Sequence, residues 1–217
     1  MRVLITAGPT HEPLDPVRFL GNHSTGKMGY ALAAAFAAAG ADVVLISGPT
    51  NLPDPASPHI LTTRVQTAAE MYAAAATAAN EAAVWMFAAA VADYRPAEVA
   101  AQKIKKSGER LTLELVKNVD IAFELGKTKR PEQFSVGFAL ETENELAHAL
   151  GKLGRKNFDL IVLNSLRDAG AGFRHDTNQV TLLDADGRTT AFGLKSKTDV
   201  ARDIVGVVLD RLAARHV

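Results

Sequence analysis

Short apolar runs alternate with alanine-rich amphipathic stretches along most of this chain. The apolar runs have the length of buried strands and fall at residues 3–7, 42–47, 60–65, 83–90, 134–140 and 159–163. Helix-forming residues between and after them predict helices at 27–39, 67–79, 120–125, 143–156 and 198–212. Several strand runs end at Gly-Pro or at small residues, which mark the turn that follows a strand.

This alternation predicts an α/β fold with a doubly wound, mostly parallel, Rossmann-like sheet and helices on both faces. We expect a single domain over residues 1–217. Two segments interrupt the pattern and are expected to be excursions from the sheet. They are a flap insertion at about 95–115 and a β-hairpin at about 180–192, built on Asp186-Gly187. Ligands of such sheets bind at the carboxyl ends of the strands, so we expect the site there.

The composition excludes several classes of function. The chain has 24 basic and 24 acidic residues and no net charge, which does not favour nucleic acid as a partner. It has no cysteine, which excludes disulfides, thiolate metal sites and a cysteine nucleophile. No apolar run reaches the roughly 18 residues of a membrane span, and the N-terminus shows no signal-peptide pattern. We therefore expect a soluble, cytoplasmic protein without a membrane or nucleic-acid partner.

The strongest functional signal lies at residues 87–106, FAAAVADYRPAEVAAQKIKK. A buried strand ends there in small residues that let a ligand approach the backbone, and the carboxylate of Asp93 stands beside them. Lys103, Lys105 and Lys106 follow, a basic stretch suited to closing over phosphates because lysine is a mobile point charge. A solvated loop explains the same lysines, but their place after the strand favours a nucleoside triphosphate site.

Residues 21–27, GNHSTGK, match the first seven positions of a phosphate loop, G-x-x-x-x-G-K-[ST]. The match fails at Met28, because a thioether is a poor ligand for Mg²⁺. Here Ser24 or Thr25 is either an N-cap or part of an anion-binding helix start. A nucleotide-dependent kinase or hydrolase on this loop is the alternative enzyme. The fingerprint G-x-G-x-x-G is absent after the first strand, which argues against a dinucleotide-dependent oxidoreductase.

Weaker signals lie in the second half of the chain. Lys152 and Lys156 are four residues apart and share one helix face, which is either solvent-facing or part of a site. Asn118 is expected to cap the helix that follows it. The histidines show no metal-ligand spacing, and no G-x-S-x-G or comparable nucleophile motif appears.

Taken in order, the motifs resemble one family closely. They are ITAGPTHEPLDPVRFLGNHSTGKMG, ISGPT, AAAVADYRP, KIKK, LVKNVDI, VGFALET, KLGRKNFDLIVLN and KSKTDVA, and they span residues 4 to about 200. This set is similar to phosphopantothenoylcysteine synthetase, the phosphopantothenate–cysteine ligase of coenzyme A synthesis. One departure is Val119, where many bacterial members have proline, and we expect no loss of function from it.

The resemblance implies a ligase reaction in two steps. The carboxylate of 4′-phosphopantothenate attacks the α-phosphate of a nucleoside triphosphate, which gives an acyl-nucleotidylate and pyrophosphate. The amine of L-cysteine then attacks the acyl carbon and releases the nucleoside monophosphate. The KIKK and KNVDI segments resemble the bacterial type, so we expect CTP with Mg²⁺ and an acyl-cytidylate intermediate.

The resemblance also implies roles for matching residues. Asn22 is expected to hold the acyl-nucleotidylate and to donate to the developing oxyanion during cysteine attack. Lys103 is expected to neutralise triphosphate charge, and Asp93 to bind Mg²⁺. The residues expected at the pantothenate are Arg18, Ser24, Gly26 and Ala90. The residues expected around the nucleotide, besides Lys103, are Phe87, Ala88, Ala89, Asp93, Val119, Asp120, Ile121, Ala122, Phe138, Lys152 and Lys156.

The resemblance extends to partners. Members of the family form dimers in which an excursion from one subunit completes the other subunit's site, so we expect a homodimer, with residues 95–115 or 180–192 in that role. Many bacterial members are fused behind a flavin-dependent decarboxylase, and this chain is either a stand-alone ligase or one domain of such a fusion. A non-catalytic nucleotide- or flavin-binding module on the same sheet is the alternative from another class.

Overall fold

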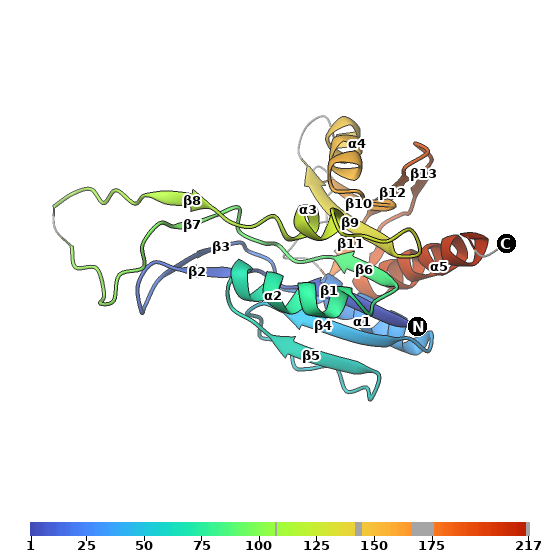
Figure 1. Cartoon of the computed structure of the whole chain (residues 1–217), viewed down its shortest axis with the longest axis horizontal. Coiled ribbons are helices and arrows are strands. Elements are labelled where there is room, and N and C mark those ends of the chain that lie inside the picture. The colour runs from blue at the N-terminus through green and yellow to red at the C-terminus, as the bar shows by residue number, and fades with distance from the viewer. Residues whose placement is uncertain (107, 142–144, 166–175, 216–217) are drawn as a thin grey trace.

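The computed structural model describes residues 1–106, 108–141, 145–165 and 176–215. Its centre is an eight-stranded sheet in which six neighbouring strands run parallel (Figure 1). The strands lie in the order β13 (Thr189–Ala191), β12 (Val180–Asp184), β10 (Leu160–Ser165), β9 (Phe134–Glu141), β6 (Val84–Phe87), β1 (Arg2–Ala7), β4 (Asp42–Ser47) and β5 (Ile60–Arg64). The predicted α/β class and mostly parallel sheet are confirmed.

Helices cover both faces of the sheet. On one face lie α1 (Lys27–Ala38) and α5 (Lys197–Arg215), and on the other lie α2 (Ala68–Ala79), α3 (Ile121–Gly126) and α4 (Glu145–Arg155). Side chains of β1 alternate between the two cores: Val3 and Ile5 pack on one side and Leu4 on the other. The first residues of the predicted helix at 143–156 lie outside the described residues. Of the helices that the structure describes, none is both long and apolar enough to cross a membrane.

Local sequence signals set the helix ends. Helix α2 begins with a capping box, in which the Thr67 side chain accepts from the Glu70 N–H and the Glu70 side chain accepts from the Thr67 N–H. Helix α1 is followed by Gly40 with a φ of 82°, a conformation that glycine adopts without strain. These two ends agree with the predicted boundaries.

The hairpin at 180–192 forms, but its predicted place outside the sheet was wrong. Strand β12 pairs antiparallel with β10 and extends the main sheet, and β13 is the edge strand beside it. The reason is burial on both faces: Leu182 packs in one core and Leu183 in the other. A hairpin whose first strand is covered on both sides cannot leave the sheet.

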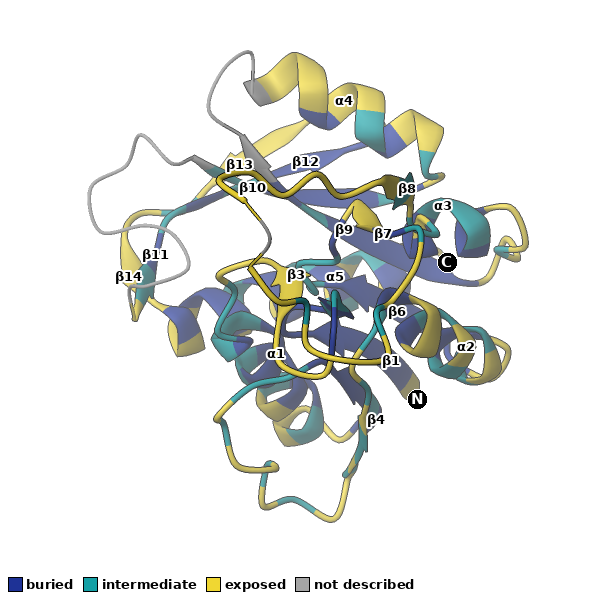
Figure 2. Cartoon of the chain, turned by 90° about the vertical axis from the view of Figure 1, so that its left-hand side faces the viewer, coloured by how far each residue is buried: buried dark blue, intermediate teal, exposed yellow. Residues whose placement is uncertain are grey.

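Two antiparallel ribbons lie outside the sheet and project from the carboxyl ends of its strands, as Figure 1 shows. They are β2 (His11–Pro13) with β3 (Phe19–Gly21), and β7 (Tyr94–Pro96) with β8 (Leu115–Lys117). We call residues 11–21 and 94–117 together the arm, and residues 97–114 within it the flap. A further small ribbon pairs β11 (Thr177–Asn178) with β14 (Lys195–Ser196). Figure 2 shows that the arm is largely exposed, whereas the sheet is buried.

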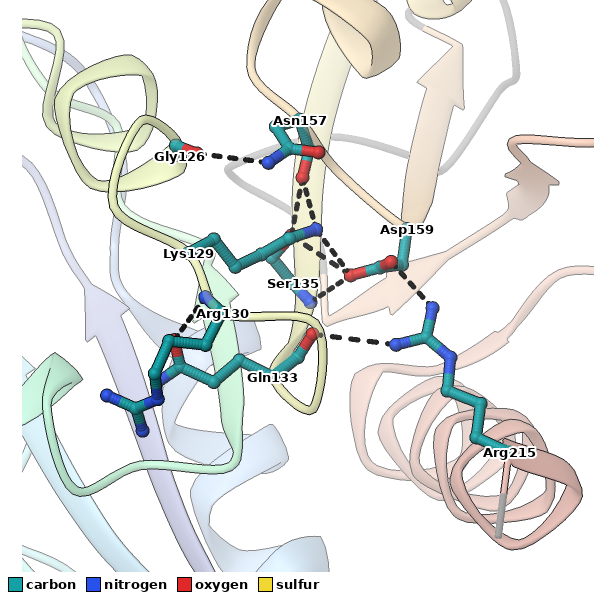
Figure 3. A network of polar contacts seen from close by, with 8 residues as sticks. All are labelled: Gly126, Lys129, Arg130, Gln133, Ser135, Asn157, Asp159 and Arg215. Carbon is teal, nitrogen blue, oxygen red and sulfur yellow. Dashed lines mark hydrogen bonds and ion pairs between the residues drawn. The ribbon is translucent and has the colours of Figure 1, made fainter. Parts of the chain in front are cut away.

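A polar network anchors the amino-terminal edge of the sheet (Figure 3). The Asp159 carboxylate accepts hydrogen bonds from Lys129 Nζ (2.8 Å), the Ser135 N–H (2.7 Å) and Arg215 Nη2 (2.6 Å). Burial by itself raises the pKa of Asp159, but the bonds from Lys129, Arg215 and Ser135 outweigh it and hold that pKa below its usual range. Arg215 ends α5, so this carboxylate ties the last helix to strands β9 and β10.

Candidate functional site

A pocket of about 260 Å³ opens at the carboxyl end of β6, beside β9 and the start of α3. Ten of the residues expected around the nucleotide line it: Phe87, Ala89, Asp93, Val119, Asp120, Ile121, Ala122, Phe138, Lys152 and Lys156. They come from four separate segments of the sequence, which the parallel sheet brings to one edge. Neither Ala88 nor Lys103 is among the lining residues. Ala88 instead packs against the core on the other face.

Three phenylalanines give this pocket an apolar wall. The rings of Phe87 and Phe158 lie 5.7 Å apart at a tilt of 39°, and Phe138 lines the same pocket. The Phe158 ring crosses β9 at Gly137, where a side chain would overlap it. An aromatic surface of this kind offers a nucleobase a face for stacking.

The loop after β6 is fixed by backbone bonds. The Ala90 N–H donates to Gly8 O (2.8 Å), and the Ala92 N–H donates to Thr10 Oγ1 (3.0 Å). Asn118 then closes the loop from the other side, with its N–H on Asp93 O and its Nδ2 on Ala92 O, both at 2.8 Å. These bonds use the backbone of Asp93, so its carboxylate is left exposed at the pocket.

The start of α3 brings charge to the pocket. Asp120 caps the helix, because its Oδ1 accepts from the Phe123 N–H at 3.2 Å. The prediction that Asn118 is this cap was wrong, since its side chain is bound to Ala92 O. Lys156 donates to the same Asp120 oxygen at 2.9 Å, which joins the start of α3 to the segment after α4. The pocket therefore combines two carboxylates, Asp93 and Asp120, with Lys152 and Lys156.

Asn22 lies between this pocket and a second one of about 670 Å³, which it lines together with Ser24, Thr25 and Lys27. Its Nδ2 donates to Ala90 O (3.1 Å) and Val91 O (3.2 Å). Because both bonds use the amide nitrogen, the expected donation from Asn22 to an oxyanion conflicts with this geometry. The other polar group of the Asn22 side chain is its carbonyl oxygen, Oδ1. Ala90, expected at the pantothenate, lines neither pocket and serves as the partner of Asn22.

The helix start at α1 is not capped by Ser24 or Thr25. Gly26 is the N-cap in a left-handed conformation with φ 77°, and glycine has no side chain that could accept a hydrogen bond from the first turn. Ser24 Oγ instead accepts from the Gly26 N–H at 3.3 Å. Gly21, the first position of the phosphate-loop match, belongs to β3 and not to a loop after a sheet strand. This placement argues further against a phosphate loop at residues 21–27.

The flap carries Lys103 away from the pocket of its own chain. Its segment between β7 and β8 lies at the far end of the arm in Figure 1, and Lys103 is exposed there. Arg18, expected at the pantothenate, lies on the same arm and is paired with Asp15 at 2.5 Å. The structure thus groups Arg18 with Lys103 and separates both from the pocket lining.

Sequence reasoning missed several lining residues: Thr6, Val91, Ala92, Asn118 and Phe158. Val91 and Ala92 stood inside the recognised AAAVADYR segment, and a rule that includes the whole loop after a strand would have found them. Phe158 carries no such signal, because it is one apolar residue in a run before β10. In the part of the chain that the structure describes, no three His, Asp or Glu side chains gather into a metal site.

These features define a class: a doubly wound α/β protein with a pocket of rings, carboxylates and lysines at the carboxyl ends of its strands. The chain belongs to the family described as the DNA/pantothenate metabolism flavoprotein C-terminal domain, whose model matches residues 1–212. The family resemblance in the motifs is thereby confirmed.

Known relatives agree with this family. The chain is 45% identical over 211 residues to the coenzyme A biosynthesis bifunctional protein CoaBC of Haemophilus influenzae, which covers 97% of this chain and 52% of that protein. It is 50% identical over 208 residues to a protein named cysteine/cysteine sulfinic acid decarboxylase, from an unknown prokaryotic organism, with coverage of 96% and 58%. The chain thus spans about half the length of these curated relatives. A crystal structure of the C-terminal domain of CoaBC superposes on this chain with a TM-score of 0.83 and 40% sequence identity. The match covers 98% of this chain and 96% of that one.

Proposed function

We propose that this chain is a phosphopantothenate–cysteine ligase. It joins 4′-phosphopantothenate to L-cysteine with CTP through an acyl-cytidylate, and it gives phosphopantothenoylcysteine, CMP and pyrophosphate. The observation that carries the proposal is the single pocket in which ten residues expected from the motifs meet. Relatives named for coenzyme A biosynthesis match almost the whole chain, which supports the same assignment.

In the first step, the aromatic wall receives the cytosine, and backbone groups near Ala89 and Asp120 read its edge. Lys152 and Lys156 come from the α4 side and counter phosphate charge. Mg²⁺ commonly binds through one or two carboxylates together with substrate phosphates, so the exposed Asp93 carboxylate fits an ion brought in with the triphosphate. When bound, that ion neutralises phosphate charge.

In the second step, the neutral cysteine amine attacks the acyl carbon and forms a C–N bond. The bond between the acyl carbon and the phosphate oxygen breaks, CMP leaves with its electrons, and the amine releases one proton to solvent. Asn22 Oδ1 is placed to accept a hydrogen bond from an N–H donor, because the amide nitrogen is engaged with Ala90 O and Val91 O. We infer that this oxygen orients the attacking amine. The role replaces the expected donation to the oxyanion and keeps Asn22 in the second step.

A second copy of the chain is the partner we propose. In one pocket, the charges of Lys152 and Lys156 are balanced by Asp93 and Asp120, which leaves a triphosphate short of cations. The arm carries further lysines and many exposed apolar side chains: Val17, Phe19, Leu20, Tyr94, Val99, Leu111, Leu113 and Leu115. Burying this surface against a second chain brings Lys103 to the partner's pocket. The hairpin at 180–192 is not needed for this role, since it belongs to the sheet.

The proposal also covers the protein's wider setting. Because the chain spans about half of relatives named as bifunctional proteins or as a decarboxylase, we propose that it works beside a flavin-dependent decarboxylase that consumes its product. A cytoplasmic location remains a prediction of the proposal.

Pyrophosphate release tests the reaction. The purified chain is given Mg²⁺ and CTP or ATP, with or without phosphopantothenate and with or without cysteine. We expect pyrophosphate only when phosphopantothenate is present, and CMP with phosphopantothenoylcysteine only when cysteine is added. Steady release of a nucleoside diphosphate would instead support the kinase or hydrolase alternative. Nucleotide binding without substrate-dependent pyrophosphate release would support a non-catalytic module and overturn the ligase.

A further inference from the structure

Asp15 lies at the tip of the β2–β3 hairpin, and its side chain is completely buried. Its Oδ1 accepts from the N–H groups of Val17 (2.9 Å) and Arg18 (2.8 Å). Its Oδ2 accepts from Arg18 Nε (3.0 Å), from Arg18 Nη2 (2.5 Å) and from the Ile104 N–H (3.1 Å). Four of these five hydrogen bonds are local to the hairpin, and the fifth reaches the flap.

The contact with the flap is made at both polar groups of Ile104. Asp15 accepts from its N–H, and Arg18 Nη2 donates to its carbonyl oxygen at 2.9 Å. A third bond joins the two ribbons nearby, from the Ala100 N–H to Leu14 O at 3.0 Å. We call Asp15, Arg18 and Ile104 the latch. Lys103 immediately precedes Ile104, so the latch fixes the backbone from which the Lys103 side chain extends.

The latch is not explained by the stability of the fold. The hairpin is already closed by the β2–β3 pairing and by the Leu14 N–H on Arg18 O at 2.8 Å. No described residue of the arm belongs to either hydrophobic core. Burying a carboxylate costs free energy unless it is fully paired. Arg18 supplies that pairing and holds the pKa of Asp15 well below its usual range, so the group stays charged.

We propose that Asp15 is a positioning residue for the nucleotidyl-transfer step and acts through Lys103. With Arg18 it holds the Ile104 backbone, so that the flap lysine is presented to the triphosphate without first having to be ordered. Preordering a loop in this way strengthens binding because less conformational entropy is lost when the ligand arrives. The proposal rests on the ligase function proposed above.

The test compares Asp15→Asn with Glu12→Gln. The first variant places an amide –NH₂ against either the Arg18 guanidinium or the backbone N–H donors, so it breaks one side of the latch. The second is a matched control: Glu12 is a buried carboxylate of the same hairpin, but it accepts from the Ala68 N–H of α2 (2.9 Å) and not from the flap. Hydrogen exchange of the Ile104 amide reports the latch directly, whether or not the enzyme is active.

We expect hydrogen exchange of the Ile104 amide to become about tenfold faster in Asp15→Asn, because a hydrogen bond to a charged group stabilises the closed state by a factor of this order. In Glu12→Gln we expect the exchange rate to be unchanged. The KM for CTP should rise about tenfold, with the KM for cysteine retained. In a Lys103→Ala background, Asp15→Asn should cause no further loss of CTP affinity, measured by CTP titration.

Two results would overturn the latch. Unchanged Ile104 exchange in Asp15→Asn shows that the contact does not hold the flap. Faster exchange together with an undiminished Asp15→Asn effect in the Lys103→Ala background shows that Asp15 does not act through Lys103. Failure of the proposed ligase function is distinguished by the wild-type chain, which would then release no pyrophosphate while its Ile104 amide remains protected. That outcome removes the catalytic role of the latch as well.

Discussion

The Phe158 ring lies across β9 where Gly137 has no side chain, and a β-carbon at that position would overlap the ring. This close approach sets the position of Phe158 against Phe87 and thereby the shape of the pocket wall. The pocket proposed to bind the nucleotide thus depends on a glycine that does not itself line it.

Gly137→Ala should therefore damage both stability and nucleotide binding. Overpacking of a filled site typically costs about 1–3 kcal/mol, and the displaced Phe158 ring would narrow the pocket. Urea unfolding and CTP titration measure the two effects. Gly206→Ala in α5 is the control, because nothing lies near its added methyl group and alanine is the better helix former by up to about 1 kcal/mol. Wild-type stability and CTP affinity in Gly137→Ala would contradict this account.

Periodicity and turn residues predicted most of the sheet and helices, since strands such as Asp42–Ser47 are short apolar runs closed by Gly-Pro. The placement of the hairpin at 180–192 could not be derived in this way. Its Asp186-Gly187 turn is visible in the sequence, but its pairing with β10 is a non-local contact. The cap of α3 was missed by two residues because Asn118 and Asp120 are both good caps, and only the bond to Ala92 O decides between them.

The pocket was predictable to the extent that its residues follow strands. The sequence from Phe87 to Asp93 is recognisable as the end of a buried strand and the loop that follows it. A parallel sheet places the carboxyl ends of all its strands at one edge. The position of Lys103 was not predictable, because a flap sequence does not reveal whether it folds over its own pocket or away from it. The arm geometry decides this, and it directs the flap away from the body (Figure 1).

The Asp159 network should make folding sensitive to acid. The folded-state pKa of Asp159 is lowered, so its contribution to stability is present above the unfolded value of about 4 and is lost as the pH falls through the folded pKa. Asp159→Asn should cost about 3 kcal/mol near neutral pH, because Lys129 and Arg215 lose their partner. The same substitution should also reduce the dependence of the free energy of unfolding on pH in the acid range. Urea unfolding from pH 7 to pH 3 measures both, with the exposed Asp186→Asn as control. An unchanged acid slope in Asp159→Asn would contradict the assignment.

CTP should be used in preference to ATP. Small residues and backbone groups after Phe87 suit a pyrimidine ring, and discrimination by hydrogen bonds that the wrong base leaves unpaired reaches roughly 10⁴-fold in favourable sites. The ratio of kcat/KM for the two nucleotides, at saturating phosphopantothenate and cysteine, measures the preference. Equal efficiencies would refute it.

Nucleotidyl transfer should require Mg²⁺. Excess chelator should abolish pyrophosphate release, and added Mg²⁺ should restore it. Asp93→Asn should raise the Mg²⁺ concentration needed for half-maximal rate, because the exposed carboxylate is the group available to share the ion with the phosphates. Asp186→Asn, an exposed carboxylate in the hairpin turn, should leave this concentration unchanged. Full activity in chelator would remove the metal from the reaction.

The two half-reactions should separate by residue. We expect Lys103 to act on the triphosphate, so Lys103→Ala should suppress formation of the acyl-cytidylate. Asn22 presents Oδ1 beside the loop at Ala90 and Val91, and we expect it to act when cysteine attacks. Asn22→Ala should therefore spare the first step and slow the second by about 10²-fold, the order of loss when a reacting group is no longer held in position.

Rapid quenching followed by mass measurement distinguishes the two variants. Acyl-cytidylate should accumulate in Asn22→Ala and be absent in Lys103→Ala. Asn22→Asp is the informative companion, since it keeps an acceptor oxygen but loses the donors that bind Ala90 O and Val91 O. If the oxygen alone mattered, this variant would retain the second step, whereas a displaced loop would slow it as in Asn22→Ala. Accumulation in Lys103→Ala, or wild-type turnover in both alanine variants, would show that the catalytic roles lie elsewhere.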